Sequence, residues 1–240
     1  MAIDYTFTES RESAPEGLKS EEGSTHGYLP AFGDSGLTIG WGVDVSHYTV
    51  EQMRGWGVSE EDLKVLERYS MKKKDLGGGS WKYVLGPQGT SIADRNNPHL
   101  DIYLREDGKR SGYAKEISSK SLKALNAGIR QKFEKEAKSS YESLSGKKWD
   151  KLTNAQQTVL YDIAYSSGGD FISGKTRKLK QHVSDNNWNL IEQELNSGTW
   201  DLMDVSRRKL QSSLLNSEKI TKSYNEFNQS TEIDSMEIPP

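Results

Sequence analysis

Residues 27–46 read GYLPAFGDSGLTIGWGVDVS, and they place Thr38 and Asp44 six positions apart in a glycine-rich, β-prone segment. A Glu-Gly pair, Glu22 and Gly23, lies just upstream. A carboxyl group, a hydroxyl and a second carboxylate are the side chains with which an enzyme protonates a glycosidic oxygen and holds a water molecule against the sugar. The first hypothesis from this segment is therefore hydrolysis of a glycosidic bond.

The composition is that of a folded chain with little net charge. Of the 240 residues 33% are hydrophobic, and six Trp and eleven Tyr supply bulky side chains for a core. The formal net charge of -3 gives no general electrostatic reason to bind nucleic acid or anionic lipid. Because the chain has no cysteine, disulfides, Cys-ligated zinc and thiol nucleophiles are excluded.

Sequence signals for metals, nucleotides and membranes are also missing. The histidines lack HxxxH or HExxH spacing, and the LGGGS run at residues 76–80 lacks the phosphate-loop pattern. The N-terminus lacks the basic and apolar regions of a cleaved signal peptide, and no run approaches the ~20 apolar residues of a membrane span. We expect no metal, no cofactor, no nucleic-acid partner and no transmembrane segment.

The first half of the chain predicts short elements. Residues 1–12 are polar and acidic and are expected to form an arm, followed by a short helix from residue 13 to 23. Tyr28–Val45 predicts a small hairpin or sheet. An acidic first turn after Ser59 predicts a helix that ends near Lys73, and the turn-rich residues 75–113 predict an irregular or weakly β insertion.

The second half predicts helices. A long helix capped by Ser118 or Ser119 is expected to run towards Leu144 and to end at Gly146. A largely buried helix is expected within Leu152–Ser167, capped by Thr153 or Asn154. Further helices are expected at residues 176–183, 188–195 and 201–216, the last extending towards Phe227, and residues 226–240 are expected to form a polar tail.

Three blocks of the sequence resemble one known family. YLP followed by SGLTIGWGVDVS, which ends at Ser46, resembles the SGxTIGxGxD segment of pesticin-type lysozyme domains, which are related to the T-even phage lysozymes. LTNAQQTVLYDIAYSSGG at Leu152–Gly169 is similar to the buried helix of that family, and SGTWD at Ser197–Asp201 and the Arg207-Arg208 pair are weaker matches. The resemblance covers residues 13–225, except for the unmatched insertion at 75–113.

The resemblance implies a role for each residue of the opening motif. It makes Glu22 the general acid that protonates the leaving oxygen, Asp44 the carboxylate that activates or orients water, and Thr38 a residue that helps to hold that water. It implies hydrolysis, with inversion, of the β-1,4 bond between N-acetylmuramic acid and N-acetylglucosamine in peptidoglycan. Compared with the family, this chain has three residues, Ser24–His26, between the Glu-Gly pair and Gly27-Tyr28.

The resemblance also implies residues that bind substrate or support the acid. A helix that faces the cleft in the family carries Gln156, Tyr161 and Tyr165. Because a glycosidase acid needs a raised pKa, Tyr28 and helices of the second lobe are expected to form a wall that shields the acid from water. Arg207 or Arg208 would pair with the catalytic glutamate, because guanidinium binds carboxylate in a planar two-bond geometry.

Structural roles compete with each of these assignments. Glu16 and Glu21 are rivals of Glu22, since one also precedes a glycine and the other is adjacent. Asp44 has the position of a turn or helix cap, and Thr38 that of an ordinary strand residue. Core packing is an alternative for both tyrosines, and a surface salt bridge is one for the arginines.

The sequence thus predicts an α+β, mainly α, two-lobed lysozyme-like fold, with a small β-sheet lobe at 13–113 and a larger helical lobe at 114–225. The predicted function is that of a muramidase, as an antibacterial toxin or effector or as a phage lysin. It would be made in the cytoplasm and reach peptidoglycan in the periplasm or outside the cell by a route other than a signal peptide. An immunity or inhibitor protein and a secretion or delivery component are the further expected partners. The rival hypotheses are a non-catalytic glycan-binding module on the same fold and a hydrolase of a chitin-type glycan.

Overall fold

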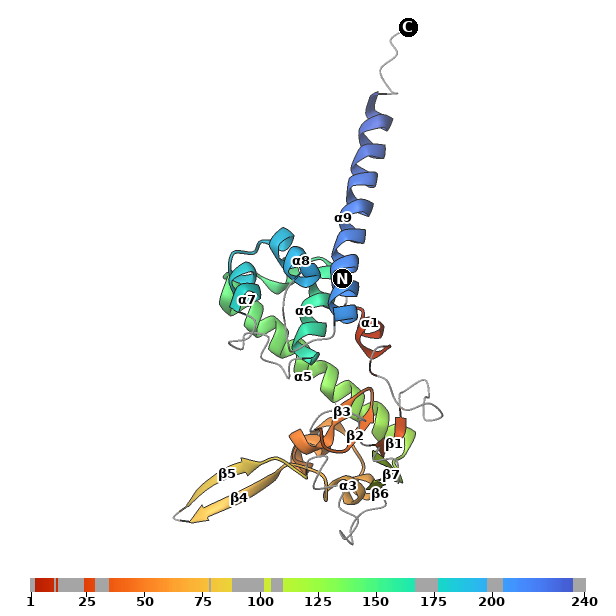
Figure 1. The fold of residues 1–240 in the computed structure, drawn as a ribbon, viewed down its shortest axis with the longest axis vertical. Coiled ribbons are helices and arrows are strands. Elements are labelled where there is room, and N and C mark those ends of the chain that lie inside the picture. Colours follow the sequence, from red (N-terminus) through yellow and green to blue (C-terminus); the bar gives the residue numbers. More distant parts are fainter. Residues whose placement is uncertain are drawn as a thin grey trace. The chain divides into compact units, whose positions relative to one another are not determined.

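The structure is a computed structural model, and Figure 1 shows its helices and strands. It describes residues 3–10, 12, 24–28, 35–77, 79–87, 102–104, 110–166, 177–197 and 205–234. The fold class is α+β and mainly α, as the sequence predicts. The chain forms two compact units, Glu9–Gln131 and Met1–Thr8 with Lys132–Pro240, which are called here the sheet unit and the helical unit.

The sheet unit contains a five-stranded antiparallel sheet with the strand order β3-β2-β1-β7-β6. Its strands are β1 (Ser24–Tyr28), β2 (Thr38–Gly40), β3 (Val43–Asp44), β6 (Ile102–Leu104) and β7 (Arg110–Glu116). Beside them lie η1 (Val45–His47), α2 (Val50–Trp56), α3 (Glu60–Leu66) and the first part of α5 (Ser119–Ser145). Leu37, Ile39, Met53, Leu63 and Leu122 are fully buried, so this unit has a core of its own.

Two helices of the sheet unit show where local sequence signals succeed and fail. Ser59 caps α3 as predicted, but the helix ends at Leu66 because Lys72 and the residues after it form a strand. Helix α2 is not predicted from the sequence. Its start is closed by a capping box between Thr49 and Gln52, an i, i+3 signal typical of helix starts.

The predicted insertion at 75–113 contains regular β structure. Strands β4 (Lys72–Gly77) and β5 (Ser80–Val84) form a separate antiparallel hairpin, and β6 and β7 join the main sheet. The hairpin is the yellow arm in Figure 1. Every side chain described in its two strands is exposed, so it makes little contact with a core.

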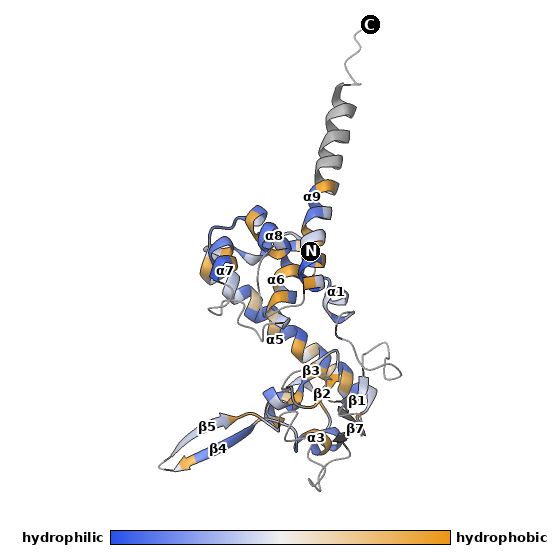
Figure 2. Cartoon of the chain, in the orientation of Figure 1, coloured by the Kyte–Doolittle hydropathy of each residue, from blue (hydrophilic) through white to orange (hydrophobic). Residues whose placement is uncertain are grey.

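The helical unit is built from α6 (Asn154–Ser166), α7 (Arg177–Ser184), α8 (Trp188–Ser197), α9 (Val205–Asp234), the short η2 (Trp149–Lys151) and the second part of α5. The predicted end of α5 at Gly146 is confirmed, and this glycine has the left-handed φ of 64° that closes a helix. Nine residues of α6 are buried, which confirms the predicted buried helix. Figure 2 shows hydrophobic residues recurring along α5 and α6.

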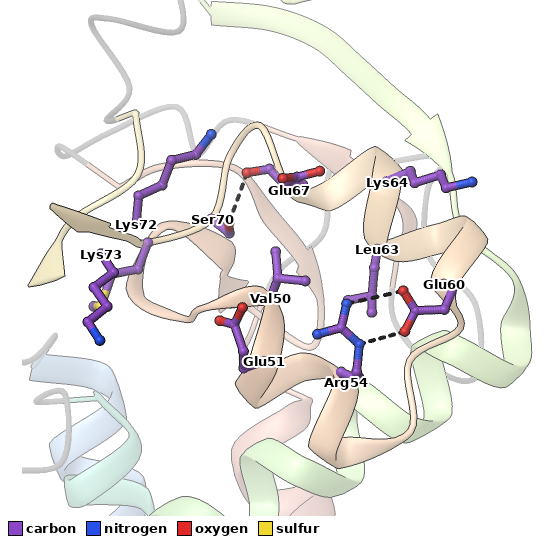
Figure 3. Close-up of a pocket in the computed structure, with 11 residues that line it drawn as sticks. Val50, Glu51, Arg54, Glu60, Leu63, Lys64, Glu67, Ser70, Lys72 and Lys73 are labelled. Carbon is purple, nitrogen blue, oxygen red and sulfur yellow. Dashed lines mark hydrogen bonds and ion pairs between the residues drawn. The ribbon is translucent and has the colours of Figure 1, made fainter. Parts of the chain in front are cut away.

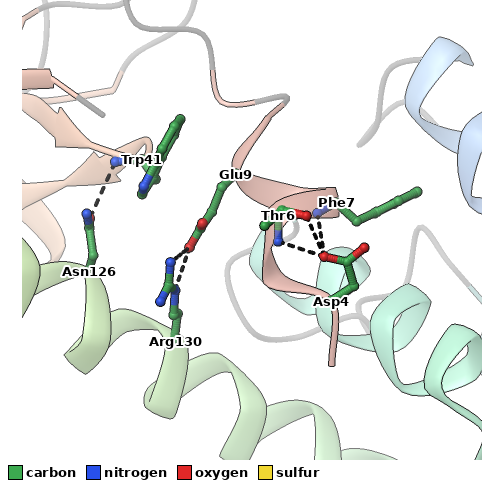
Figure 4. Close-up of polar contacts among 7 residues, drawn as sticks. All are labelled: Asp4, Thr6, Phe7, Glu9, Trp41, Asn126 and Arg130. Carbon is green, nitrogen blue, oxygen red and sulfur yellow. Dashed lines mark hydrogen bonds and ion pairs between the residues drawn. The ribbon is translucent and has the colours of Figure 1, made fainter. Parts of the chain in front are cut away.

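The two ends of the chain differ from the expected arm and tail. Tyr5–Glu9 forms helix α1, which Asp4 caps by accepting hydrogen bonds from the backbone N–H groups of Thr6 and Phe7 (Figure 4). Tyr5 packs edge-on against Tyr161 at 5.2 Å, and its hydroxyl donates to Glu134. These aromatic and polar contacts hold a segment whose composition alone resembles a solvated arm. At the other end, α9 is helical to residue 234, so the predicted tail begins later than residue 226.

Gly128 in α5 allows a close contact that predicts a stability difference. A Cβ atom on Gly128 would lie 2.1 Å from Cγ of Trp56, whereas a Cβ on Gly55 in α2 would meet nothing within 4 Å. We expect Gly128→Ala to lower the free energy of unfolding by about 1–3 kcal/mol, because the Trp56 ring must move. The matched control, Gly55→Ala, should raise it by up to about 1 kcal/mol, because alanine is the better helix former. Chemical denaturation of both variants tests this, and equal stabilities would contradict the packing of Trp56 on Gly128.

Candidate functional site

The opening motif folds into the β2–β3 hairpin, which brings Thr38 and Asp44 together. The two residues are register partners across the hairpin, one pair beyond Ile39 and Val43. Gly40 and Gly42, on either side of Trp41 in the turn, have φ angles of 60° and 79°. Glycine adopts this left-handed conformation at little cost, so both glycines suit the turn that joins the strands. The spacing of six residues in the sequence thus becomes a cross-strand pair.

Asp44 caps η1 in the structure. Its Oδ1 accepts hydrogen bonds from the backbone N–H of Ser46 at 3.0 Å and from the Ser46 hydroxyl at 2.6 Å. Its Oδ2 accepts from the backbone N–H of Gly36 at 3.0 Å and lies 3.6 Å from Nε2 of His47. The capping alternative from the sequence is therefore confirmed as a structural role. A carboxylate offers about four acceptor sites, so these bonds are compatible with one further contact.

Thr38 is 4% exposed and belongs to a strand whose three residues are all buried. Its hydroxyl donates to the backbone carbonyl of Gly36 at 3.4 Å, which is a long hydrogen bond. Thr38 and Asp44 therefore contact the same short segment, since Gly36 also donates to Asp44. Local hydrogen bonds hold the pair in place without a ligand.

The predicted acid, Glu22, and its rivals Glu16 and Glu21 lie outside the described residues. The choice of Glu22 stays a prediction.

Glu12 is a carboxylate that the sequence analysis assigned to the arm and that the structure places at the hairpin turn. A Cβ atom on Gly42 would lie 2.5 Å from Oε2 of Glu12 and 3.1 Å from its Cβ. The Glu12 side chain therefore packs directly against the backbone of the turn. Burial raises the pKa of the Tyr28 hydroxyl to about 12, and the negative charge of Glu12 contributes to the shift. Both observations place Glu12 beside the hairpin that carries Thr38 and Asp44.

Glu9 lies at the end of α1, and its backbone carbonyl accepts a hydrogen bond from the N–H of Glu12. Its buried carboxylate forms an ion pair with Arg130 on α5, in which Nε of Arg130 is 2.5 Å from Oε1 of Glu9. One turn earlier on α5, Asn126 accepts a hydrogen bond from the backbone N–H of Trp41 (Figure 4). The same face of α5 thus holds both Glu9 and the hairpin turn.

A pattern of alternating aromatic residues is a sequence signal for Glu9, but not for Glu12. Tyr5 and Phe7 in YTFTE are unusual for a solvated arm, and they mark the helix that ends at Glu9. The contact between Glu12 and Gly42 joins residues 30 positions apart and has no local signal.

Tyr28 is 5% exposed on β1, so it is part of the core rather than an open cleft wall. We expect its hydroxyl to titrate near pH 12 in the folded protein. Because burial holds the folded-state pKa above the ordinary value of 10.0, the free energy of unfolding is unaffected by this group below pH 10 and falls as the pH rises from 10 to 12. The decrease amounts to about 2–3 kcal/mol once the pH has passed 12.

The placement of Glu12 can be tested by an NMR titration of ring-labelled tyrosine, in which Tyr28→Phe assigns the signal. Glu12→Gln should lower the pKa of Tyr28 but leave it above 10.0, because burial is the larger cause. If the pKa of Tyr28 is unchanged in Glu12→Gln, Glu12 does not lie beside Tyr28.

The substrate-binding residues predicted on the buried helix have structural roles. Tyr161 is fully buried and packs on Tyr5 and Tyr165, so its assignment to substrate binding is wrong and the core alternative is confirmed. Tyr165 packs on Phe133 with ring centroids 5.0 Å apart. Gln156 accepts from the backbone N–H of Thr153 and forms part of the cap of α6. The sequence pattern of α6 is explained by packing and capping.

The arginine pair also has partners within the helical unit. Arg207 forms a two-bond ion pair with Asp162 of α6, which is fully buried, and not the surface salt bridge that the sequence left open. Arg208 is 4% exposed and donates to the backbone carbonyl of Leu195 on α8. Both arginines therefore connect α9 to neighbouring helices.

Among the described residues, no group of three or more His, Cys, Asp or Glu side chains is arranged to hold a metal ion. No helix in the described part of the chain combines the length and apolar character needed to cross a membrane. No model of a known protein family matches the chain, and no curated protein sequence matches it either.

Proposed function

We propose that this protein is a muramidase that hydrolyses the β-1,4 bond between N-acetylmuramic acid and N-acetylglucosamine in peptidoglycan. The observation that supports this proposal is the β2–β3 hairpin, in which Thr38 is paired with Asp44 while Glu12 packs against the turn. These residues supply a hydroxyl and two carboxyl groups at one hairpin. Glycoside hydrolysis by two carboxyl groups requires no metal or cofactor.

In this proposal Glu12 protonates the leaving oxygen. Its nearest rival among the described residues, Glu9, forms an ion pair with Arg130. A guanidinium partner favours the ionised form of a carboxyl group, whereas a general acid must carry a proton when the reaction starts. Glu9 therefore fits a positioning role, at the end of the helix that leads to Glu12. Glu22, which the family resemblance implies as the acid, is the alternative that mutation must compare with Glu12.

Asp44 and Thr38 act on the water in the same proposal. The three hydrogen bonds from Ser46 and Gly36 fix the orientation of the Asp44 carboxylate. A carboxylate fixed in this way orients a water molecule without rearranging during the reaction, which is the advantage of a preorganised site. Thr38, its cross-strand partner, is the hydroxyl nearest in register to help hold that water.

The biological setting belongs to the proposal as well. A muramidase of this kind acts on peptidoglycan in the periplasm or outside the cell, as a delivered antibacterial effector or as a phage lysin. An effector would require a delivery component, and the producing cell would require an immunity or inhibitor protein.

A non-catalytic glycan-binding module is the second candidate. It is favoured by the low exposure of Thr38 and by the bonds that Asp44 makes within its own hairpin. A structural role in the hairpin is sufficient to explain both features.

The test is to incubate the purified protein with peptidoglycan sacculi and to identify the released fragments by mass spectrometry. A muramidase leaves reducing N-acetylmuramic acid ends. Release of reducing N-acetylglucosamine ends would reject this bond specificity, and cleavage of chitin oligomers but not sacculi would favour the chitin-type hydrolase. Binding to sacculi without any release would favour the non-catalytic module.

A further inference from the structure

The β4–β5 hairpin is joined at both ends to the turn that Asp44 caps. The backbone N–H of Met71, just before β4, donates to the carbonyl of Tyr48 at 2.8 Å. The N–H of Gly86, just after β5, donates to the carbonyl of Ser46 at 2.9 Å. Ser46 in turn donates to Asp44. The base of the hairpin therefore has a fixed position relative to the candidate catalytic carboxylate.

A cavity of about 760 Å³ lies between this base and the residues that follow Asp44. Its lining includes His47 and Gln52 on one side and Met71, Lys73 and Tyr83 on the other. His47 is also the residue whose ring nitrogen lies 3.6 Å from Asp44. The volume falls within the ~300–1,000 Å³ range of small-molecule sites. The cavity thus extends from His47, the neighbour of Asp44, to Tyr83 on the hairpin.

One face of the hairpin is aromatic. Trp81 and Tyr83 are two positions apart on β5, so their side chains leave the same face, and they are 49% and 53% exposed. Their rings meet edge to face at 5.0 Å, and Nζ of Lys73 lies 4.1 Å from the centre of the Trp81 ring. Exposed aromatic rings held in one arrangement form a surface on which the apolar face of a sugar ring can pack.

The other face of the hairpin is basic. Lys74 and Lys82 are direct cross-strand partners, and Lys72 lies on the same face. Figure 3 shows that Lys72 and Lys73 point apart from the base of β4. In Figure 2 the hairpin is mostly hydrophilic along β4, in keeping with its lysines. The two faces therefore offer different chemistry to a ligand, and the cavity beside Tyr83 adjoins the aromatic one.

The charges around the cavity are mixed, with Glu51 and Lys73 in the same lining. Glu51 and Lys73 also line a second cavity of about 320 Å³, in which Glu60 and Glu67 are accompanied by Arg54, Lys64 and Lys72 (Figure 3). A wall with one carboxylate and one lysine has no excess of positive charge with which to select a polyanion. An uncharged sugar ring, which needs aromatic contact and a few polar groups, is compatible with this wall.

We propose that the cavity beside His47 and Tyr83, together with the aromatic face of the β4–β5 hairpin, binds uncharged N-acetylhexosamine units of a glycan strand. Tyr83 and Trp81 pack on the sugar rings, and the Gln52 amide and Lys73 donate hydrogen bonds to hydroxyl or acetamido oxygens. This inference rests on the proposed function, because it extends the glycan from Asp44 along the hairpin. It predicts that a preference for longer glycan substrates comes from the hairpin, which lies outside the opening motif.

The test measures binding of a soluble N-acetylglucosamine tetramer to the full chain by NMR, following the indole signal of Trp81. Wild-type protein should shift this signal on titration, and Tyr83→Leu should weaken binding about tenfold, which corresponds to about 1.4 kcal/mol. Tyr83→Phe keeps the ring and should bind within about threefold of wild type. Lys82→Ala, on the basic face, is the matched control and should also bind normally.

The outcomes separate this inference from the proposed function. If wild type binds the tetramer through Tyr83 but releases nothing from sacculi, the glycan site stands and the muramidase proposal fails. If wild type hydrolyses sacculi while Tyr83→Leu binds and hydrolyses like wild type, the inference fails alone. Binding to phosphatidylglycerol vesicles or to single-stranded DNA that depends on Lys74 and Lys82, without tetramer binding, would replace the glycan with an anionic ligand. Spectra of each variant show whether the hairpin is still folded, and if Tyr83→Leu unfolds it, loss of binding in Lys73→Ala and Gln52→Ala is decisive.

Discussion

Arg207→Ala is expected to lower the free energy of unfolding of the helical unit by about 3–5 kcal/mol, the largest stability change that we predict. Asp162, its partner, is fully buried and accepts hydrogen bonds from Arg207 at 2.7 and 3.0 Å. Gln211 donates a third bond to the same carboxylate at 2.6 Å. Removing the guanidinium leaves a buried negative charge with only an amide partner. Thermal and chemical denaturation of the variant measure the loss.

Lys209→Ala is the matched control, because Lys209 is on the same helix and is exposed. Its effect should stay within about 0.5 kcal/mol. The double variant Asp162→Asn with Arg207→Ala should recover part of the loss, because the buried charge is then removed. If Arg207→Ala and Lys209→Ala are equally stable, the ion pair does not stabilise the helical unit.

Glu12→Gln is expected to lower the rate of reducing-end release from sacculi by about 10²–10⁴-fold, the largest change in activity that we predict. Glutamine keeps the size of the side chain and its packing on Gly42, but it cannot deliver a proton. The measurement is the initial rate of release at a fixed sacculus concentration, with the unfolding temperature recorded for each variant. A loss of activity without loss of stability would assign a chemical role to Glu12.

Glu9→Gln and Glu22→Gln are the controls for this assignment. Glu9→Gln keeps a hydrogen-bonding partner for Arg130 and should lower the rate less than Glu12→Gln. Full activity of Glu12→Gln with loss of activity in Glu22→Gln would transfer the acid role to the residue that the family resemblance implies. A loss confined to Glu9→Gln would show that its ion pair with Arg130 does not prevent it from acting as the acid.

Elements with strong local signals could be predicted from the sequence. The helix α5 has a regular apolar repeat and ends at a glycine, and α3 has an N-cap followed by an acidic turn. These features involve residues within one or two helical turns of each other, so a short stretch of sequence is enough to predict them. The end of α3 was wrong, because whether Lys72–Gly77 continues a helix or forms a strand depends on its pairing with Ser80–Val84.

Helix α1, near the start of the chain, could not be predicted because it depends on contacts with residues far away in the sequence. α1 is short and polar, and the contacts of Tyr5 with Tyr161 and Glu134 reach more than a hundred residues along the chain. The roles of the candidate site residues also depend on distant contacts. Tyr161 has the spacing and chemistry of a cleft residue, but its burial among aromatic rings makes it part of the core.

The sequence by itself determined the segment that matters most here: a threonine and an aspartate at a spacing that two short strands and a glycine turn convert into a cross-strand pair. It also determined the mainly helical class, because caps and apolar periodicity act over a few residues. Only the tertiary structure decided which acidic side chain packs on that hairpin and which partner Arg207 has. The reason is physical: burial and ion pairing depend on residues far apart in the chain, so a local pattern is compatible with several partners until the chain folds.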